Sequence, residues 1–209
     1  MKKMLALTAM AVIAFSGFAM AQPVDPDSDG MSFYFDTEGM NYCMQVDDWV
    51  PAIGAGPTFM GYVLVTRADT PYPSIQAWEA QVIFTSNSYT PPTGLALTPG
   101  AADYDGDLND YVVGCGGAAA IAITGDATVI ASVELTWLGF EGHASLTVEM
   151  YGVAGSISFP EGPGYAAEAG FPSPCQCIFG TWGPVAWVNE TCNPVANEDM
   201  TWGSVKSLY

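Results

Sequence analysis

The chain has few basic residues. Only four of its 209 residues are lysine or arginine, against 22 aspartates and glutamates, and the net charge is −18. Nucleic acids and anionic lipid surfaces are bound through clustered lysine and arginine side chains. The composition therefore excludes nucleic acid and anionic membranes as partners.

Histidine is almost absent, because His143 is the only one in the sequence. A zinc site needs several clustered cysteine or histidine ligands. A serine or cysteine nucleophile needs a histidine base, and no GxSxG-like motif accompanies His143. The sequence therefore favours a non-catalytic protein, and no catalytic residue can be assigned.

The longest apolar run lies near the start, within MKKMLALTAMAVIAFSGFAMA. Lys2 and Lys3 precede apolar residues 4–18, and a small-x-small pattern follows at 19–21, which is how a secretory signal peptide is built. The run is shorter than the roughly 20 residues of a membrane helix. We expect cleavage before Gln22 and a mature chain that is periplasmic, secreted or on the cell surface, without a membrane span.

Cysteines are also few, and an exported protein uses them for disulfides more often than for metal binding. The five are Cys43, Cys115, Cys175, Cys177 and Cys192. Either Cys175 or Cys177 is expected to bond to Cys192, because the three lie close together among proline and glycine. Cys43 and Cys115 are the other disulfide candidates, and the odd count leaves one thiol free or intermolecular.

Alternating apolar and polar residues predict strands with one buried face. In residues 127–137 the apolar side chains fall on odd positions and only Ile130 interrupts the pattern, whereas in residues 144–150 they fall on even positions. We interpret residues 127–151 as a β-hairpin of an antiparallel sheet. A strand is also predicted at residues 75–84, with its core face formed by Gln76, Trp78, Ala80, Val82 and Phe84.

The remaining chain consists of short strand-like segments separated by glycine and proline, without helical periodicity. Further strands are expected at residues 32–37, 59–68, 95–97, 111–113, 118–124 and 185–188, and a loop at 162–177. This pattern predicts an all-β fold, a two-sheet antiparallel β-sandwich of immunoglobulin-like or jelly-roll-like character.

The predicted organisation has four parts. A signal peptide occupies residues 1–21 and an acidic N-terminal arm residues 22–30. The β-sandwich domain follows at 31–198, and a C-terminal tail at 199–209. In the tail, Trp202, Val205 and Leu208 fall three apart and indicate a short helix.

Two acidic segments have a spacing that suits calcium. Asp25, Asp27, Asp29, Gly30 and Asp36 match positions 1, 3, 5, 6 and 12 of an EF-hand loop. The second segment, DYDGDLND, contains Asp103, Asp105 and Asp107. However, the strand-like SFYF follows Gly30, and Gly106 is misplaced for an EF-hand. An acidic linker and a solvated turn are the favoured interpretations, and calcium is the alternative cofactor.

Aromatic and acidic side chains supply candidates for ligand binding. Trp182 and Trp187 could form a platform on which sugar rings stack, with a plug of the core as the alternative. Glycoside hydrolysis needs two carboxylates across a cleft. The strand residues Glu79, Glu134 and Glu149 would have to supply them, although all three fall on polar, outward faces. A secreted glycoside hydrolase is therefore the alternative to a non-catalytic binding module.

The C-terminus TWGSVKSLY follows the pattern WGxVKxLY, and the segments SFYFDT and AWEAQVIF accompany it. In these features the chain resembles a group of uncharacterised exported proteins from environmental bacteria. The resemblance implies a cohesin-like or carbohydrate-module-like sandwich and carries no activity over. We therefore expect a surface, matrix or ligand-binding module whose partner is a polysaccharide or a cell-surface protein.

Overall fold

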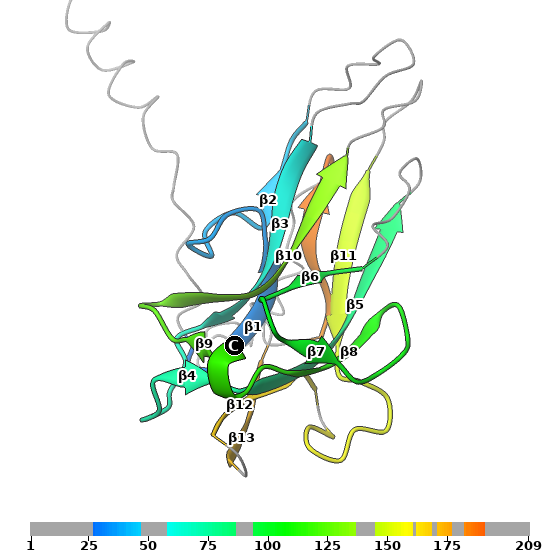
Figure 1. Cartoon of the computed structure of the whole chain (residues 1–209). Helices are drawn as coiled ribbons and strands as arrows, with labels where there is room; N and C mark the ends of the chain where they lie inside the picture. The colour runs from blue at the N-terminus through cyan, green and yellow to red at the C-terminus, as the bar shows by residue number, and fades with distance from the viewer. Residues whose placement is uncertain are drawn as a thin grey trace, which may run out of the picture.

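The computed structural model describes residues 27–46, 58–86, 94–136, 145–160, 162–168, 171–176 and 182–190. Nearly every element in these segments is a β-strand, and the strands form two large, mainly antiparallel sheets that face each other (Figure 1). The predicted all-β sandwich is therefore confirmed. Among the described residues, no helix is long and apolar enough to cross a membrane.

The first sheet is built around strand β3 (Thr58–Thr66). Its strand order is β1 (Gly30–Tyr34), β3, β10 (Ala127–Thr136) and β6 (Ala96–Leu97). β3 pairs antiparallel with β1 on one side and with β10 on the other. Gly61 in β3 has to be a glycine, because a Cβ atom there would overlap the ring of Phe33 in β1.

The interruption at Ile130 marks a β-bulge in β10. The register against β3 shifts between Val129 and Ala131. Before the bulge Thr128 is buried, and after it Ala131, Val133 and Leu135 are buried. An extra residue in one strand reverses which positions face the core. Ile130 shares the buried face with Thr128, two residues earlier, and is buried too. It breaks the alternation of the sequence because the buried positions change from even to odd at the bulge.

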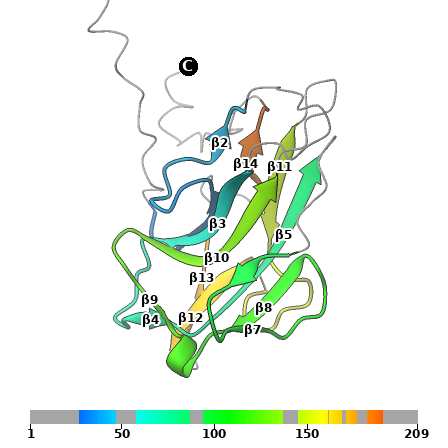
Figure 2. The same cartoon turned by 45° about the horizontal axis from the view of Figure 1, so that its top comes forward.

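The second sheet has the order β13 (Phe171–Pro174), β12 (Gly164–Glu168), β5 (Ala77–Ser86), β11 (Leu146–Tyr151), β14 (Gly183–Val188) and β2 (Cys43–Met44). β8 (Asp110–Gly114) also pairs with β5, and β7 (Ala102–Asp103) pairs with β8. Figure 2 shows β12 and β13 on one side of β5, with β8 and β7 on the other. Two short strands, β4 (Ser74–Ile75) and β9 (Ile121–Ala122), form a separate pair.

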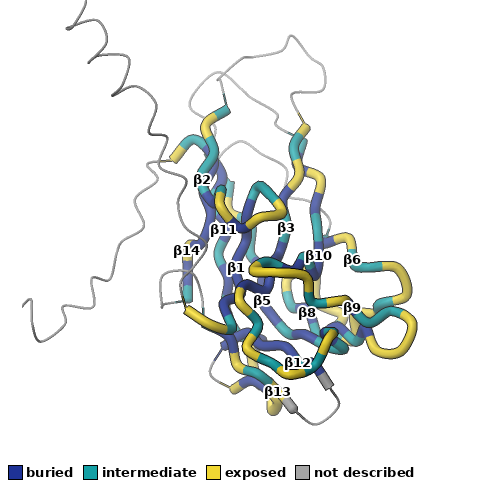
Figure 3. Tube along the Cα trace, turned by 90° about the vertical axis from the view of Figure 1, so that its left-hand side faces the viewer, coloured by how far each residue is buried: buried dark blue, intermediate teal, exposed yellow. Residues whose placement is uncertain are grey.

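The core lies between the two large sheets, and the buried residues of Figure 3 follow their strands. Phe33 of the first sheet meets Phe84 of the second edge to face, with ring centroids 5.6 Å apart. Trp78 is fully buried in β5 and stacks on Tyr111 of β8 at 5.9 Å. The predicted core face of β5 is thus confirmed.

The predicted hairpin at residues 127–151 is wrong, although both of its strands exist. β10 pairs with β3 and β6 in the first sheet, whereas β11 pairs with β5 and β14 in the second. Each strand needs a partner for its backbone groups and a core for its apolar face. Strands from distant parts of the chain meet both needs here, so neighbours in sequence are not neighbours in a sheet.

Two further predictions are wrong. Residues 118–124 do not form one buried strand, because a 3₁₀ turn at Gly117–Ala119 is followed by the two-residue strand β9. The predicted loop at 162–177 contains the paired strands β12 and β13. The signal peptide and the C-terminal helix lie outside the described residues.

Cys115, a predicted disulfide candidate, is free and buried, so that prediction is wrong. Cys175 is also free and buried, which excludes Cys175–Cys192, the first of the two predicted alternatives, and leaves Cys177–Cys192 as a prediction. Cys115 packs as a small core side chain, with its Sγ 3.5 Å from the carbonyl oxygen of Ile75. Cys43 is disulfide-bonded. Cys177 and Cys192 lie outside the described residues.

The buried thiols and a buried phenol should make the fold sensitive to alkali. Burial raises the pKa of Cys115 from 9.0 to about 11. Burial raises the pKa values of Cys175 and Tyr165 too, and the negative charge of Asp29 adds to both shifts. Groups whose pKa is higher in the folded state contribute stability below the unfolded pKa and lose it as the pH rises through the folded pKa.

We therefore expect the free energy of unfolding to fall above pH 9.0 because of the two thiols and above pH 10.0 because of the phenol as well, by about 1.4 kcal/mol per pH unit for each group. Urea titrations at pH 8, 9, 10 and 11 measure this slope. The variant Cys115→Ala should fall less steeply between pH 9 and 11. A stability that stays constant from pH 8 to 11 would contradict the prediction.

Candidate functional site

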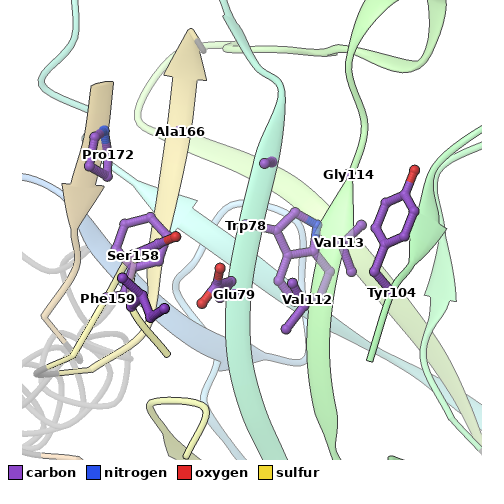
Figure 4. Close-up of a pocket in the computed structure, with 12 residues that line it drawn as sticks. Trp78, Glu79, Tyr104, Val112, Val113, Gly114, Ser158, Phe159, Ala166 and Pro172 are labelled. Carbon is purple, nitrogen blue, oxygen red and sulfur yellow. The ribbon is translucent and has the colours of Figure 1, made fainter. Parts of the chain in front are cut away.

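An open groove of about 450 Å³ lies across the second sheet at the N-terminal end of β5 (Figure 4). It crosses β13, β12, β5 and β8 and reaches the segment after β7. Its lining residues are Ala77, Trp78, Glu79, Tyr104, Val112, Val113, Gly114, Ile157, Ser158, Phe159, Ala166 and Pro172. Neighbouring strands lie ~4.8 Å apart, so the groove is about 14 Å long from β13 to β8.

Small residues form the floor of this groove. The register places Ala77 opposite both Gly114 of β8 and Ala166 of β12. Directly paired residues point to the same face of a sheet. The buried residues of β5, such as Trp78, occupy the inner face, so these three lie on the outer face. Their small size leaves a shallow, apolar depression between larger neighbours.

The aromatic residues Tyr104 and Phe159 flank the floor, and each is seated on a glycine. A Cβ atom on Gly114 would lie 2.8 Å from the ring of Tyr104, and one on Gly164 would overlap the ring of Phe159. Phe159 is buried, whereas Tyr104 is 77% exposed. Tyr104 therefore rests one side of its ring on the sheet and presents the rest to solvent.

Glu79 is the acidic group inside the groove. It is half-buried on the outer face of β5, and its Oε2 accepts a hydrogen bond of 2.5 Å from the hydroxyl of Ser156. The Ser156 hydroxyl oxygen in turn accepts a hydrogen bond from the N–H of Phe159 at 3.0 Å. Glu79 thereby fixes the loop that follows β11 against the sheet.

This loop supplies an almost fully exposed apolar side chain to the groove. Ile157 is 96% exposed, and Ser158 beside it is exposed as well. Glycines set the position of the loop, because a Cβ atom on Gly152 would come within 2.8 Å of the Gly162 backbone. The groove therefore combines an exposed aromatic ring, an aliphatic side chain, hydroxyl groups and one carboxylate.

The tryptophans predicted as a platform do not line the groove, since Trp187 lies in β14 and Trp182 directly precedes it. Trp187 is only 9% exposed and packs edge to face against Tyr42, with centroids 6.1 Å apart. Trp182 is half-buried, and its indole occupies the space where a Gly162 side chain would be. Both fill space in the fold, so the exposed aromatic ring of the groove is Tyr104 instead.

Among the described residues, the two acidic segments do not gather their carboxylates. Asp29 and Asp36 flank β1, about 16 Å of extended strand, and Asp25 lies outside the described residues. Asp27 is exposed. Asp29 accepts hydrogen bonds from the Tyr165 hydroxyl at 2.5 Å and the Asp69 N–H at 2.9 Å. It thus fixes the start of β1.

The second segment, DYDGDLND, is shaped by its own side chains. Asp103 accepts from the N–H groups of Asp105 and Val112, and Asp105 accepts from those of Gly106 and Asp107. Such bonds are typical of aspartates that stabilise turns. In the part of the chain that the structure describes, no three acidic, cysteine or histidine side chains are placed to hold a metal. Calcium binding stays a prediction.

The three glutamates of the hydrolase hypothesis are not brought together. Glu134 is exposed on the first sheet, whereas Glu79 and Glu149 lie on the second. Glu149 pairs with Ile83, four residues beyond Glu79, which is about 13 Å along the strand. Paired glycosidase carboxylates lie at most about 9.5 Å apart. This arrangement therefore gives the hydrolase hypothesis no support.

Part of the groove could be found from sequence and part could not. The alternation in β5 places Glu79 on the outer face. Tyr104 could not be found, because its sequence context is that of an acidic turn. Ser156, the hydrogen-bond partner of Glu79, is 77 residues away in sequence.

No protein-family model matches the chain, and no curated protein is significantly similar to it.

Proposed function

We propose that the protein is an exported, non-catalytic β-sandwich module that binds a carbohydrate in the groove across β13, β12, β5 and β8. The observation that supports this function best is the exposed ring of Tyr104 beside a floor of small residues. A sugar ring has apolar faces that stack on an aromatic ring, and hydroxyl groups around its edge. Glu79 and Ser158 line the same groove and can accept or share hydrogen bonds with those hydroxyls.

The predicted signal peptide and the resemblance at the C-terminus are consistent with this role. They are reasons to propose a protein outside the cytoplasm, at the cell surface or in an extracellular matrix, where polysaccharides are available. The groove is open and crosses several strands, so it suits a section of a polymer better than an enclosed small molecule. Among the described residues that line it, Glu79 has no second carboxylate beside it, which favours binding over hydrolysis.

The variant Tyr104→Ala should lower the affinity for a bound glycan by roughly 10-fold, because the stacking surface is lost. Since Tyr104 is exposed, the free energy of unfolding of the variant should differ from that of the wild type by less than about 0.5 kcal/mol. A glycan array on the wild-type protein identifies a bound glycan, and isothermal titration calorimetry compares the variants.

Leu108→Ala is the matched control. Leu108 is 72% exposed in the same segment and does not line the groove. It should bind as the wild type does. Retention of no glycan, or equal affinity of Tyr104→Ala and the wild type, would overturn the proposed function.

A further inference from the structure

The carboxylate of Glu79 has unused capacity to accept hydrogen bonds. An ionised carboxylate offers about four acceptor positions. Among the described residues, the Ser156 hydroxyl is the donor to Glu79, and it bonds to Oε2. A half-buried carboxylate loses part of its hydration, and this loss is offset when a donor or a cation binds to it. The groove therefore contains a negative charge that is only partly compensated by the fold.

No basic side chain is near this charge in the described residues. Arg67 is the only lysine or arginine among them, and it follows β3 in the first sheet. Asp110 lies on the same outer face of β8, two residues before Val112, which pairs with Glu79. Its carboxylate accepts a hydrogen bond of 2.6 Å from Gln81. The groove and its surroundings are thus negative, which disfavours uronic acids and sulfated sugars and favours a cationic ligand.

The aromatic ring of Tyr104 lies close enough to Glu79 to contact a cation that is bound there. It lies over Gly114, which pairs with Ala77, and Glu79 is the diagonal neighbour of Gly114 on β5. Diagonal neighbours lie about 7–8 Å apart, so one ligand residue can touch both groups. The face of a tyrosine ring attracts an ammonium group, and the carboxylate forms a charge-assisted hydrogen bond with it.

We infer that the ligand of the groove is an amino sugar with a free ammonium group, such as a stretch of de-N-acetylated hexosamine polymer. This inference rests on the proposed carbohydrate-binding function and specifies the chemistry of the sugar. The ammonium group binds Glu79, and the sugar ring stacks on Tyr104. An N-acetyl group removes the positive charge, so the acetylated sugar loses the contact with Glu79.

Titration calorimetry of the full chain with three β-1,4-linked pentasaccharides tests the inference. The glucosamine pentamer should bind about 10-fold more tightly than the N-acetylglucosamine pentamer or cellopentaose, with an affinity that falls as salt rises. Glu79→Gln should abolish this difference. The amide oxygen still accepts the Ser156 hydrogen bond, so unchanged thermal unfolding shows that the loop is intact. Glu134→Gln, on the first sheet, is the control and should bind as the wild type does.

Each other outcome has a definite meaning. Equal affinity for the three sugars would overturn the amino-sugar inference and leave the proposed function standing. Binding of none of the three would overturn the amino-sugar inference, and the proposed function falls with it only if the glycan array also retains no glycan. If pentalysine binds as tightly as the glucosamine pentamer, or if Glu79→Gln and Glu134→Gln lower the affinity equally, the attraction comes from overall charge and the assigned contact is wrong.

Discussion

Replacing Trp78 with alanine is expected to lower the free energy of unfolding by about 3–5 kcal/mol. Trp78 has no exposed surface, and its indole stacks on Tyr111 between the two sheets. The substitution removes the largest fully buried side chain of the described residues and leaves a cavity that β5 cannot close without breaking its pairing with β8 and β12. Urea denaturation followed by circular dichroism measures the change.

The variant Trp78→Phe separates packing from polar burial. The indole Nε1 is buried without a hydrogen-bond partner in the described residues, and an unpaired buried donor costs about 1–3 kcal/mol. Phenylalanine keeps a ring against Tyr111 and removes that donor, so it should destabilise the fold much less than alanine does. If the free energy of unfolding of Trp78→Ala lies within about 1 kcal/mol of the wild-type value, Trp78 does not occupy the core as described.

Replacing Gly164 with alanine should cost about 1–3 kcal/mol and also weaken ligand binding. The added Cβ would overlap the ring of Phe159, which is buried and cannot move away freely. The loop would have to lift from the sheet, and this would break the hydrogen bond between Ser156 and Glu79. Thermal unfolding and calorimetry with the bound glycan measure the two effects.

Gly106→Ala is the control for this substitution, because a Cβ atom at Gly106 would meet nothing within 4 Å. A second variant, Gly164→Ala with Phe159→Leu, should recover part of the lost stability by making room for the methyl group. Wild-type stability and affinity in Gly164→Ala would show that Phe159 does not rest on this glycine.

The faces of the strands could be predicted from the sequence, because side chains alternate along a strand whatever its partner is. In β5 this rule assigned Trp78 to the core and Glu79 to the outer face, as observed. The interruption at Ile130 also had a structural cause, the bulge in β10. These features depend on local backbone geometry alone.

The pairing of strands could not be predicted in the same way. The apolar faces of β10 and β11 would be buried equally well in one hairpin or in two separate sheets. The alternation of side chains does not distinguish these two arrangements. The hairpin of β12 and β13 was missed because glycine and proline disfavour strands. Gly164 is required beneath Phe159, and the two prolines of β13 lie in an edge strand, where a missing N–H costs little.

The site was only partly predictable for a related reason. Tyr104, Glu79 and Ser156 come from three separate segments, and only the pairing of β5 with β8 and the fold of the loop after β11 bring them to one groove. Trp182 and Trp187 are large aromatic residues in a segment rich in glycine, and this composition alone predicts a platform. Burial depends on the three-dimensional neighbours of a residue, such as Tyr42 beside Trp187, which the sequence does not list.

The pairing of the early strands with the last described ones has a kinetic consequence. β2 pairs with Trp187 and Val188 of β14, and the N–H of Met31 in β1 bonds to the carbonyl of Gln176. In a chain emerging from a ribosome or a translocon, β2 therefore cannot pair with β14 until Val188 has been released. Folds dominated by such distant contacts form in milliseconds to seconds. This protein should consequently fold after synthesis or transport is complete, and truncation before β14 should leave β2 without its partner strand.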